Sequence, residues 1–127
     1  MIVIYTKSVT NADRVRFTPV IRINPHYRGD KGLLRHEQMH VLQWFVVGFT
    51  LGIPLLLATN WLIALCVAVT AHDALYHFVR KYRLHAEVMA FKKQLHHGGS
   101  VELAATHLAN DYDLNITKSQ AIKLLAP

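Results

Sequence analysis

The stretch LLRHEQMHVLQW, residues Leu33–Trp44, places two histidines four positions apart and a glutamate directly after the first. Residues four apart on a helix lie on one face, so His36 and His40 can direct both imidazoles at one metal ion. Glu37 then lies beside the metal, where its carboxylate can accept a proton from a metal-bound water. The HExxH spacing therefore predicts a zinc site with one Zn²⁺ per chain, two histidine ligands and Glu37 as the general base.

The sequence before this motif fits a short strand region followed by a helix. MIVIYT (1–6) and VIRIN (20–24) are rich in β-branched residues and predict strands, and Pro19 indicates a sheet edge or a bulge at the second. KSVTNADR (7–14), between them, is typical of a turn. We therefore expect the strands within residues 1–24 and the metal-binding helices within residues 33–96.

A zinc site needs a third protein ligand, and the downstream helix offers four candidates: His72, His77, His85 and Glu87. That helix also carries an apolar stripe at helical spacing: Leu84, Val88, Phe91 and Leu95. Glu87 lies next to the stripe, whereas His85 lies about 200° away around the helix, toward solvent. A carboxylate at the edge of an apolar face is costly unless it is paired or binds a cation, so Glu87 is the predicted ligand. The alternative is a solvent-facing Glu87 that pairs with Arg83.

Residues 41–71 contain no charged side chain, a run of 31 positions. A membrane span needs about 20 apolar residues. However, Gly52-Ile53-Pro54 and Thr59-Asn60 divide this run into shorter pieces, each nearer the size of a buried helix. We therefore predict a buried helical hairpin, and the alternative is membrane insertion or a membrane-facing surface.

The rest of the chain predicts further helices. One extends over about residues 71–96 and ends before two glycines. Ser100 is the expected cap of the next helix, and a last short helix follows. We expect a single α+β, mostly helical domain over residues 1–127, with a small pair of C-terminal helices in residues 100–126.

The charge, the aromatic residues and the cysteine count limit the partners and the cellular location that we expect for the protein. The net charge is +6, and the basic cluster at Arg80, Lys81 and Arg83 fits the solvated face of a helix, with contact to nucleic acid, anionic lipid or an acidic partner as the alternative. Aromatic residues do not interleave with these charges, so no nucleic-acid partner is predicted. The single cysteine, Cys66, cannot form an intrachain disulfide, and the first residues lack the pattern of a signal peptide. We expect a cytoplasmic or virion-associated protein.

HEQMH together with EVMAF, which starts at Glu87, resembles the gluzincins, zinc metallopeptidases with HExxH on one helix and a glutamate on a later one. HEQMHVLQW is also similar to the HExxHxxQ variant of small standalone bacterial and phage-encoded peptidase-like proteins. The resemblance extends over about residues 20–94. It implies a minimal zincin-like domain in which Glu87 binds the metal and Ala90 is the small packing residue of the second motif.

The chain departs from the gluzincin pattern at Phe91, where many members carry an aspartate that orients a ligand histidine. A ligand histidine usually gives its other N–H to a carboxylate or a carbonyl. Asp73, Asp30 or a backbone carbonyl could take this role. The departure lowers the expectation of strong catalysis and leaves the expectation of metal binding unchanged.

The resemblance also implies a place for the substrate. The strand before the zinc helix would hold an extended peptide by β-augmentation. Its residues are Val20, Ile21, Arg22, Ile23 and Asn24. The oxyanion of the reaction needs a donor besides zinc, and Tyr82 and His77 are the candidates.

Three functions follow from these patterns. The leading hypothesis is a zinc metallopeptidase that hydrolyses a peptide or protein substrate. The first alternative is a catalytically weak or inactive, zinc-stabilised structural or virion component whose partner is a protein assembly. The second alternative is a membrane-associated peptidase that contacts the membrane through residues 41–71.

Overall fold

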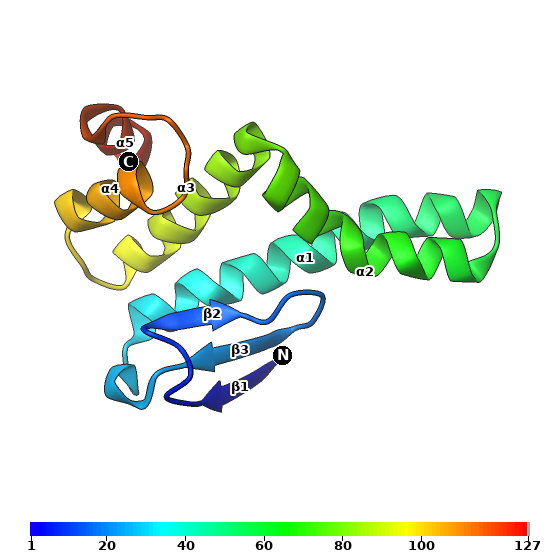
Figure 1. Cartoon of the computed structure of the whole chain (residues 1–127), viewed down its shortest axis with the longest axis horizontal. Helices are drawn as coiled ribbons and strands as arrows, with labels where there is room; N and C mark the ends of the chain where they lie inside the picture. Colours follow the sequence, from blue (N-terminus) through cyan, green and yellow to red (C-terminus); the bar gives the residue numbers. More distant parts are fainter. Residues whose placement is uncertain (127) are drawn as a thin grey trace.

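The computed structural model describes residues 1–126 and contains a small three-stranded sheet and five α-helices (Figure 1). The strands are β1 (Ile2–Tyr5), β2 (Ala12–Arg14) and β3 (Val20–Ile23), followed by a 3-10 helix at Pro25–Tyr27. The helices are α1 (Lys31–Ala58), α2 (Trp61–Phe78), α3 (Arg80–His96), α4 (Val101–Asn110) and α5 (Lys118–Leu125). The expected α+β, mostly helical fold is confirmed.

The sheet has the strand order β1-β3-β2, with β3 parallel to β1 and antiparallel to β2. Ile21 and Ile23 of β3 are buried and pack with Val41 of α1. The predicted edge strand at residues 20–24 is therefore wrong, because β3 is the central strand and β2 forms the edge beside α1 (Figure 1). β2 lies in the segment that we expected to be a turn, since three residues are too few to show a strand period.

α1 begins after Asp30, whose side chain accepts a hydrogen bond of 2.8 Å from a backbone N–H of the first turn. The helix then runs for 28 residues through Pro54, so the interruption predicted there is wrong. Gly48 and Gly52 are buried, and both face Ala68 of α2. Because glycine has no side chain, α1 and α2 can approach each other closely at these two positions. The glycines do not end α1.

The turn at Thr59 and Asn60 separates α1 from α2, as expected. A second break, at Val79, separates α2 from α3, so the single helix expected over residues 71–96 is wrong. Val79 has an extended backbone (φ −111°, ψ 94°), while its N–H still donates to the carbonyl of Leu75. The chain turns at this break, which lets α3 pack against α1.

α1 and α2 form a helical hairpin whose outer part projects from the rest of the chain (Figure 1). Its apolar side chains are exposed, among them Leu57 at 85%, Trp61 at 63% and Phe49 at 59%. Both helices are long and apolar enough to cross a membrane, and only 17% and 11% of their most apolar stretches are buried. The hairpin is confirmed, but the prediction that it is buried within the fold is wrong.

α4 and α5 form the expected C-terminal pair and pack on α3 around Phe91, Leu108 and Leu125. The Ser100 side chain caps α4, as predicted. The loop between the two helices carries Tyr112, which packs against the same core. This core therefore holds the α4–α5 loop next to α3, the helix that carries Glu87.

The close approach of α1 and α2 gives a stability prediction. A Cβ atom at Gly48 would lie 2.5 Å from the backbone oxygen of Ala68. Gly→Ala in an open helix usually stabilises by about 0.5–1 kcal/mol, but Gly48→Ala should destabilise by about 1–3 kcal/mol because the helices must separate. Urea unfolding followed by circular dichroism measures the change. Thr50→Ala, at an exposed position of the same helix, is the control, and a stabilised Gly48→Ala protein would contradict the packing.

Candidate metal centre

His36 and His40 lie one helical turn apart on the buried face of α1 and are 5% and 8% exposed. Their Nε2 atoms are 3.3 Å apart, so both imidazoles point at the same place. Two neutral imidazole nitrogens at this separation can share one cation. The helical geometry expected from the HExxH spacing is therefore present.

Glu87 of α3 completes the group. It is 1% exposed, with Oε1 3.3 Å from Nε2 of His40 and Oε2 3.5 Å from Nε2 of His36. The possible ligand atoms of the three residues all lie within 4.8 Å of one another. His85 is exposed, as predicted. The alternative of a solvent-facing Glu87 paired with Arg83 is wrong, because the carboxylate is buried against α1.

The chemistry of this group fits a divalent cation. Burial alone would raise the pKa of Glu87, but the two facing imidazoles hold that pKa well below its ordinary value, so the carboxylate is ionised. Its Oε2 atom has no hydrogen-bond partner among the described residues. A buried carboxylate with a free oxygen is costly unless it is paired or binds a metal. Two histidines and one glutamate are also a ligand set that zinc accepts.

Gln43 orients the second histidine. Its Oε1 lies 3.0 Å from Nδ1 of His40, and its Nε2 donates to the backbone carbonyl of Ala86 at 3.1 Å. With the amide group in this orientation, its oxygen can accept a hydrogen bond from Nδ1–H of His40, which would leave the lone pair of Nε2 for a metal. Gln43 is the glutamine of the HExxHxxQ pattern, but the sequence alone did not indicate this role.

His36 has a different environment. The Phe91 ring packs edge-on against its imidazole with 4.6 Å between ring centroids. Nδ1 of His36 has no hydrogen-bond partner within residues 1–126. Asp30 caps α1 and Asp73 pairs with Arg14. Neither aspartate therefore takes the role of the aspartate that many gluzincins carry at the position of Phe91. His40 is therefore held by hydrogen bonding and His36 by packing.

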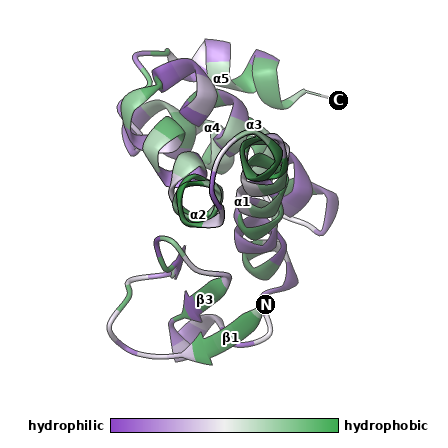
Figure 2. Ribbon diagram, turned by 90° about the vertical axis from the view of Figure 1, so that its right-hand side faces the viewer, coloured by the Kyte–Doolittle hydropathy of each residue, from purple (hydrophilic) through white to green (hydrophobic). Residues whose placement is uncertain are grey.

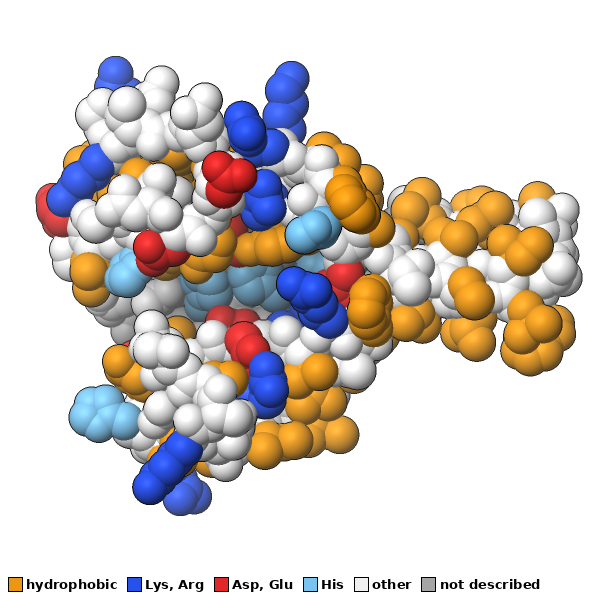
Figure 3. All heavy atoms as spheres, viewed as in Figure 1, with side chains coloured by type: hydrophobic (Ala, Val, Ile, Leu, Met, Phe, Trp, Pro, Cys, Tyr) orange, Lys and Arg blue, Asp and Glu red, His pale blue; other side chains and the backbone are white. Residues whose placement is uncertain are grey.

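Glu37 lies with the two histidines in an open cleft of about 710 Å³. β2 and the loop after it, the end of α2, and the α4–α5 loop line this cleft. Figure 3 shows histidine side chains in the hollow between the sheet and the C-terminal helices. Glu37 is 6% exposed, and burial raises the pKa of its carboxyl above the ordinary value. Its carboxyl group is thus next to the two histidines and reachable from the cleft.

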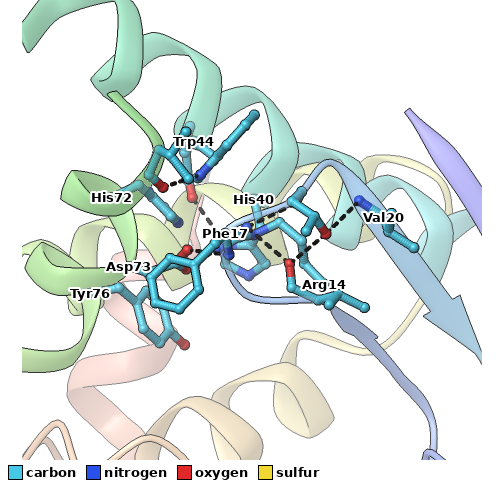
Figure 4. Close-up of polar contacts among 12 residues, drawn as sticks. Arg14, Phe17, Val20, His40, Trp44, His72, Asp73 and Tyr76 are labelled. Atoms are coloured by element: carbon cyan, nitrogen blue, oxygen red, sulfur yellow. Dashed lines mark hydrogen bonds and ion pairs between the residues drawn. The ribbon is translucent and has the colours of Figure 1, made fainter. Parts of the chain in front are cut away.

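An ion pair holds the sheet edge against α2. The Arg14 guanidinium pairs with Asp73, and the N–H of Phe17 donates to the other carboxylate oxygen at 2.7 Å (Figure 4). The two side chains of the pair are 7% and 11% exposed. Removal of one partner would leave a buried charge, which is strongly destabilising. The pair therefore fixes the position of β2 along the cleft.

The structure separates the two predicted oxyanion donors. His77 is exposed and lines the cleft. Tyr82 lines a separate, smaller cavity, and its hydroxyl lies 2.6 Å from Nδ1 of His72. Burial lowers the pKa of His72 to about 4, so the imidazole is neutral and can accept this hydrogen bond. Tyr82 is not among the residues that line the cleft with Glu37, so the structure does not bring it together with the metal-binding group.

Two tyrosines that the sequence analysis did not single out lie near the metal-binding group. The hydroxyl of Tyr76 donates a hydrogen bond to Oε1 of Glu87. Tyr112 lines the cleft, and its ring packs edge-on against Phe91 at 6.0 Å between centroids. They come from α2 and from the α4–α5 loop, so no local spacing in the sequence connects them with the motif.

Comparison of the chain with family models, curated proteins and solved structures gives no match. The function therefore has to be inferred from the residues and geometry of the site. His36, His40 and Glu87 form a buried group that could hold a metal ion, so the structure defines a candidate metal site.

Glu87→Ala should weaken metal binding far more than His85→Ala. Glu87 faces both histidines, whereas His85 on the same helix is exposed. A competition titration with zinc and a chromogenic chelator measures both affinities. Equal affinities for the two variants, or a weaker His85→Ala protein, would show that the carboxylate is no ligand.

Gln43→Ala should lower zinc affinity by about 10–100-fold, the usual effect of losing a residue that orients a ligand histidine. Gln38→Ala is the matched control, because Gln38 lies on the same helix and bonds to the exposed Arg35 instead. The same chelator titration compares the two variants. An unchanged affinity in Gln43→Ala would mean that packing alone orients His40.

Proposed function

We propose that the protein is a zinc-dependent metallopeptidase in which Glu37 is the general base. The observation that carries this proposal is the position of Glu37. It follows a ligand histidine on α1, lies beside the metal-binding group, and shares an open cleft with the edge strand β2. Two histidines and one glutamate would hold zinc with three protein ligands, the number found in catalytic zinc sites.

Each residue then has a definite task. His36, His40 and Glu87 hold zinc, which when bound lowers the pKa of a water ligand to about 7 and polarises a carbonyl oxygen. Glu37 accepts a proton from the attacking water and returns it to the amine that leaves. Gln43 keeps His40 in the tautomer that presents Nε2.

The peptide substrate would lie along β2. This strand is the edge of the sheet, and Ala12, Asp13 and Arg14 all line the cleft. An exposed strand edge binds an extended peptide through backbone hydrogen bonds. The substrate strand expected at residues 20–24 is thus replaced in this proposal by its neighbour β2, the edge strand whose residues line the cleft.

Tyr112 is the oxyanion donor that the site favours, with His77 as the second choice. Both line the cleft. Burial and the nearby carboxylates of Glu87 and Glu37 raise the pKa of Tyr112. Its phenol therefore keeps its proton and can donate a hydrogen bond to a developing negative charge.

A zinc-stabilised structural or virion component is the second candidate. The packing of Phe91 against His36 favours it, because Nδ1 of this histidine lacks the carboxylate that many active gluzincins supply. In this case the metal would join α1 to α3 and would carry out no reaction.

Glu37→Gln separates these two functions. The substitution keeps the shape of the side chain and removes the base, so zinc content and thermal stability should stay near those of the wild type. Hydrolysis of a peptide library should fall by about 10²–10⁴-fold. If the wild type cleaves peptides and Glu37→Gln cleaves them equally fast, Glu37 is not the base. If the zinc-loaded wild type cleaves none, the structural function takes precedence.

A further inference from the structure

The outer hairpin, residues 45–68, is apolar around both of its helices. It contains no charged residue. The exposed large side chains are Phe45, Val46, Phe49, Leu51, Ile53, Leu56, Leu57, Trp61, Leu62, Ile63 and Leu65. Gly48 and Gly52 of α1 and Ala64 of α2 are buried where the two helices meet. Viewed toward its tip, the ribbons of both helices of the hairpin have the colours of hydrophobic residues (Figure 2).

This distribution indicates what covers the hairpin. A helix that docks on one protein partner shows one apolar stripe, whereas a helix that is apolar all round belongs in a large core or in lipid. The hairpin projects from the globular part, and the part of the chain that the structure describes supplies no core around it (Figure 1). We propose that the outer hairpin inserts into one leaflet of a lipid bilayer.

The length of the hairpin limits the depth of insertion. From the tip to the globular part, α2 provides 11 residues, Trp61 to Ala71, which is about 16 Å at the rise of an α-helix. Directly after this stretch, the buried His72 and the ion pair of Asp73 with Arg14 tie α2 to the globular part. The hydrocarbon core of a bilayer is about 30 Å thick. The tip therefore reaches about the bilayer centre, and the chain returns on the side from which it entered.

The backbone at the tip suits an apolar medium. The N–H and the hydroxyl of Thr59 both donate to the carbonyl of Leu55, at 2.8 and 2.7 Å. The side chain of Asn60 accepts a hydrogen bond of 3.0 Å from the N–H of Ile63. Polar backbone groups in lipid must be satisfied within the protein. The turn thus satisfies several of the groups that the two helix ends would otherwise leave free.

The base of the hairpin suits a membrane surface. Figure 3 shows more hydrophobic side chains on the part of the globular body nearest the hairpin. Phe17 and Phe78 are 48% and 81% exposed and both line the cleft. Arg16, Arg80 and Lys81 are exposed next to them in the sequence, and such residues attract anionic headgroups. Insertion would bring the mouth of the cleft to the bilayer surface.

Flotation with vesicles tests insertion without any measurement of hydrolysis. The full chain, reconstituted by detergent removal, should float with phosphatidylcholine vesicles and more strongly when phosphatidylglycerol is added. Leu57→Asp places a charge near the tip and should lower partitioning by about 100-fold. Leu103→Asp, at a 59% exposed leucine of α4, is the matched control and should float like the wild type.

A wild-type chain that remains monodisperse without detergent and does not float would overturn the proposal. Equal losses in Leu57→Asp and Leu103→Asp would overturn it too, because binding would then not depend on the hairpin. Far-ultraviolet circular dichroism of each variant confirms that the helices persist. Vesicle binding can hold while peptide hydrolysis fails, so the outcome is separate from that of the proposed activity.

The depth of insertion is measured with tryptophan fluorescence. Trp44→Phe leaves Trp61, at the tip, as the only tryptophan of the chain. Lipids brominated near the ends of their acyl chains should quench Trp61 most. Strongest quenching by lipids brominated near the headgroup would overturn insertion to the bilayer centre, since the hairpin would then lie on the surface or cross the whole bilayer.

Discussion

The contact of the buried Glu87 carboxylate with His36 and His40 is the interaction on which the candidate metal centre depends. The carboxylate lies between two imidazoles of another helix, with one oxygen accepting from Tyr76 and the other lacking a hydrogen-bond partner in the described chain. Such a group is stable only where positive charge faces it. A cation at this point would join α1 to α3, so metal binding and the packing of the two helices support each other.

The sequence predicted those parts of the site that depend on local geometry. The spacing of His36, Glu37 and His40 within one helix follows from the helical period, and the position of Glu87 follows from the apolar stripe beside it. The role of Gln43 was not predicted, because it depends on the carbonyl of Ala86 in another helix. A contact between elements that are far apart in the chain produces no periodic pattern in a single sequence.

The errors in the fold have similar causes. β2 is held by pairing with β3 and by the Arg14–Asp73 ion pair, and neither is visible in a three-residue segment. The break at Val79 has no proline or glycine to mark it. Gly52 was part of the predicted interruption of α1, yet it lies within the helix and packs against Ala68 of α2. In each case tertiary packing overrides the local preference of the chain.

α2 joins the apolar hairpin to the cleft that contains the metal-binding group. Its first half is uncharged and exposes apolar side chains, while its second half supplies Asp73 to the sheet and Tyr76 to the metal-binding group. The indole N–H of Trp44 donates to the carbonyl of Val69 at 2.8 Å, at the point where the halves meet (Figure 4). Because α2 is a continuous helix, the direction of the hairpin fixes the direction in which the cleft opens. The apolar hairpin and the open cleft are therefore held in one geometry.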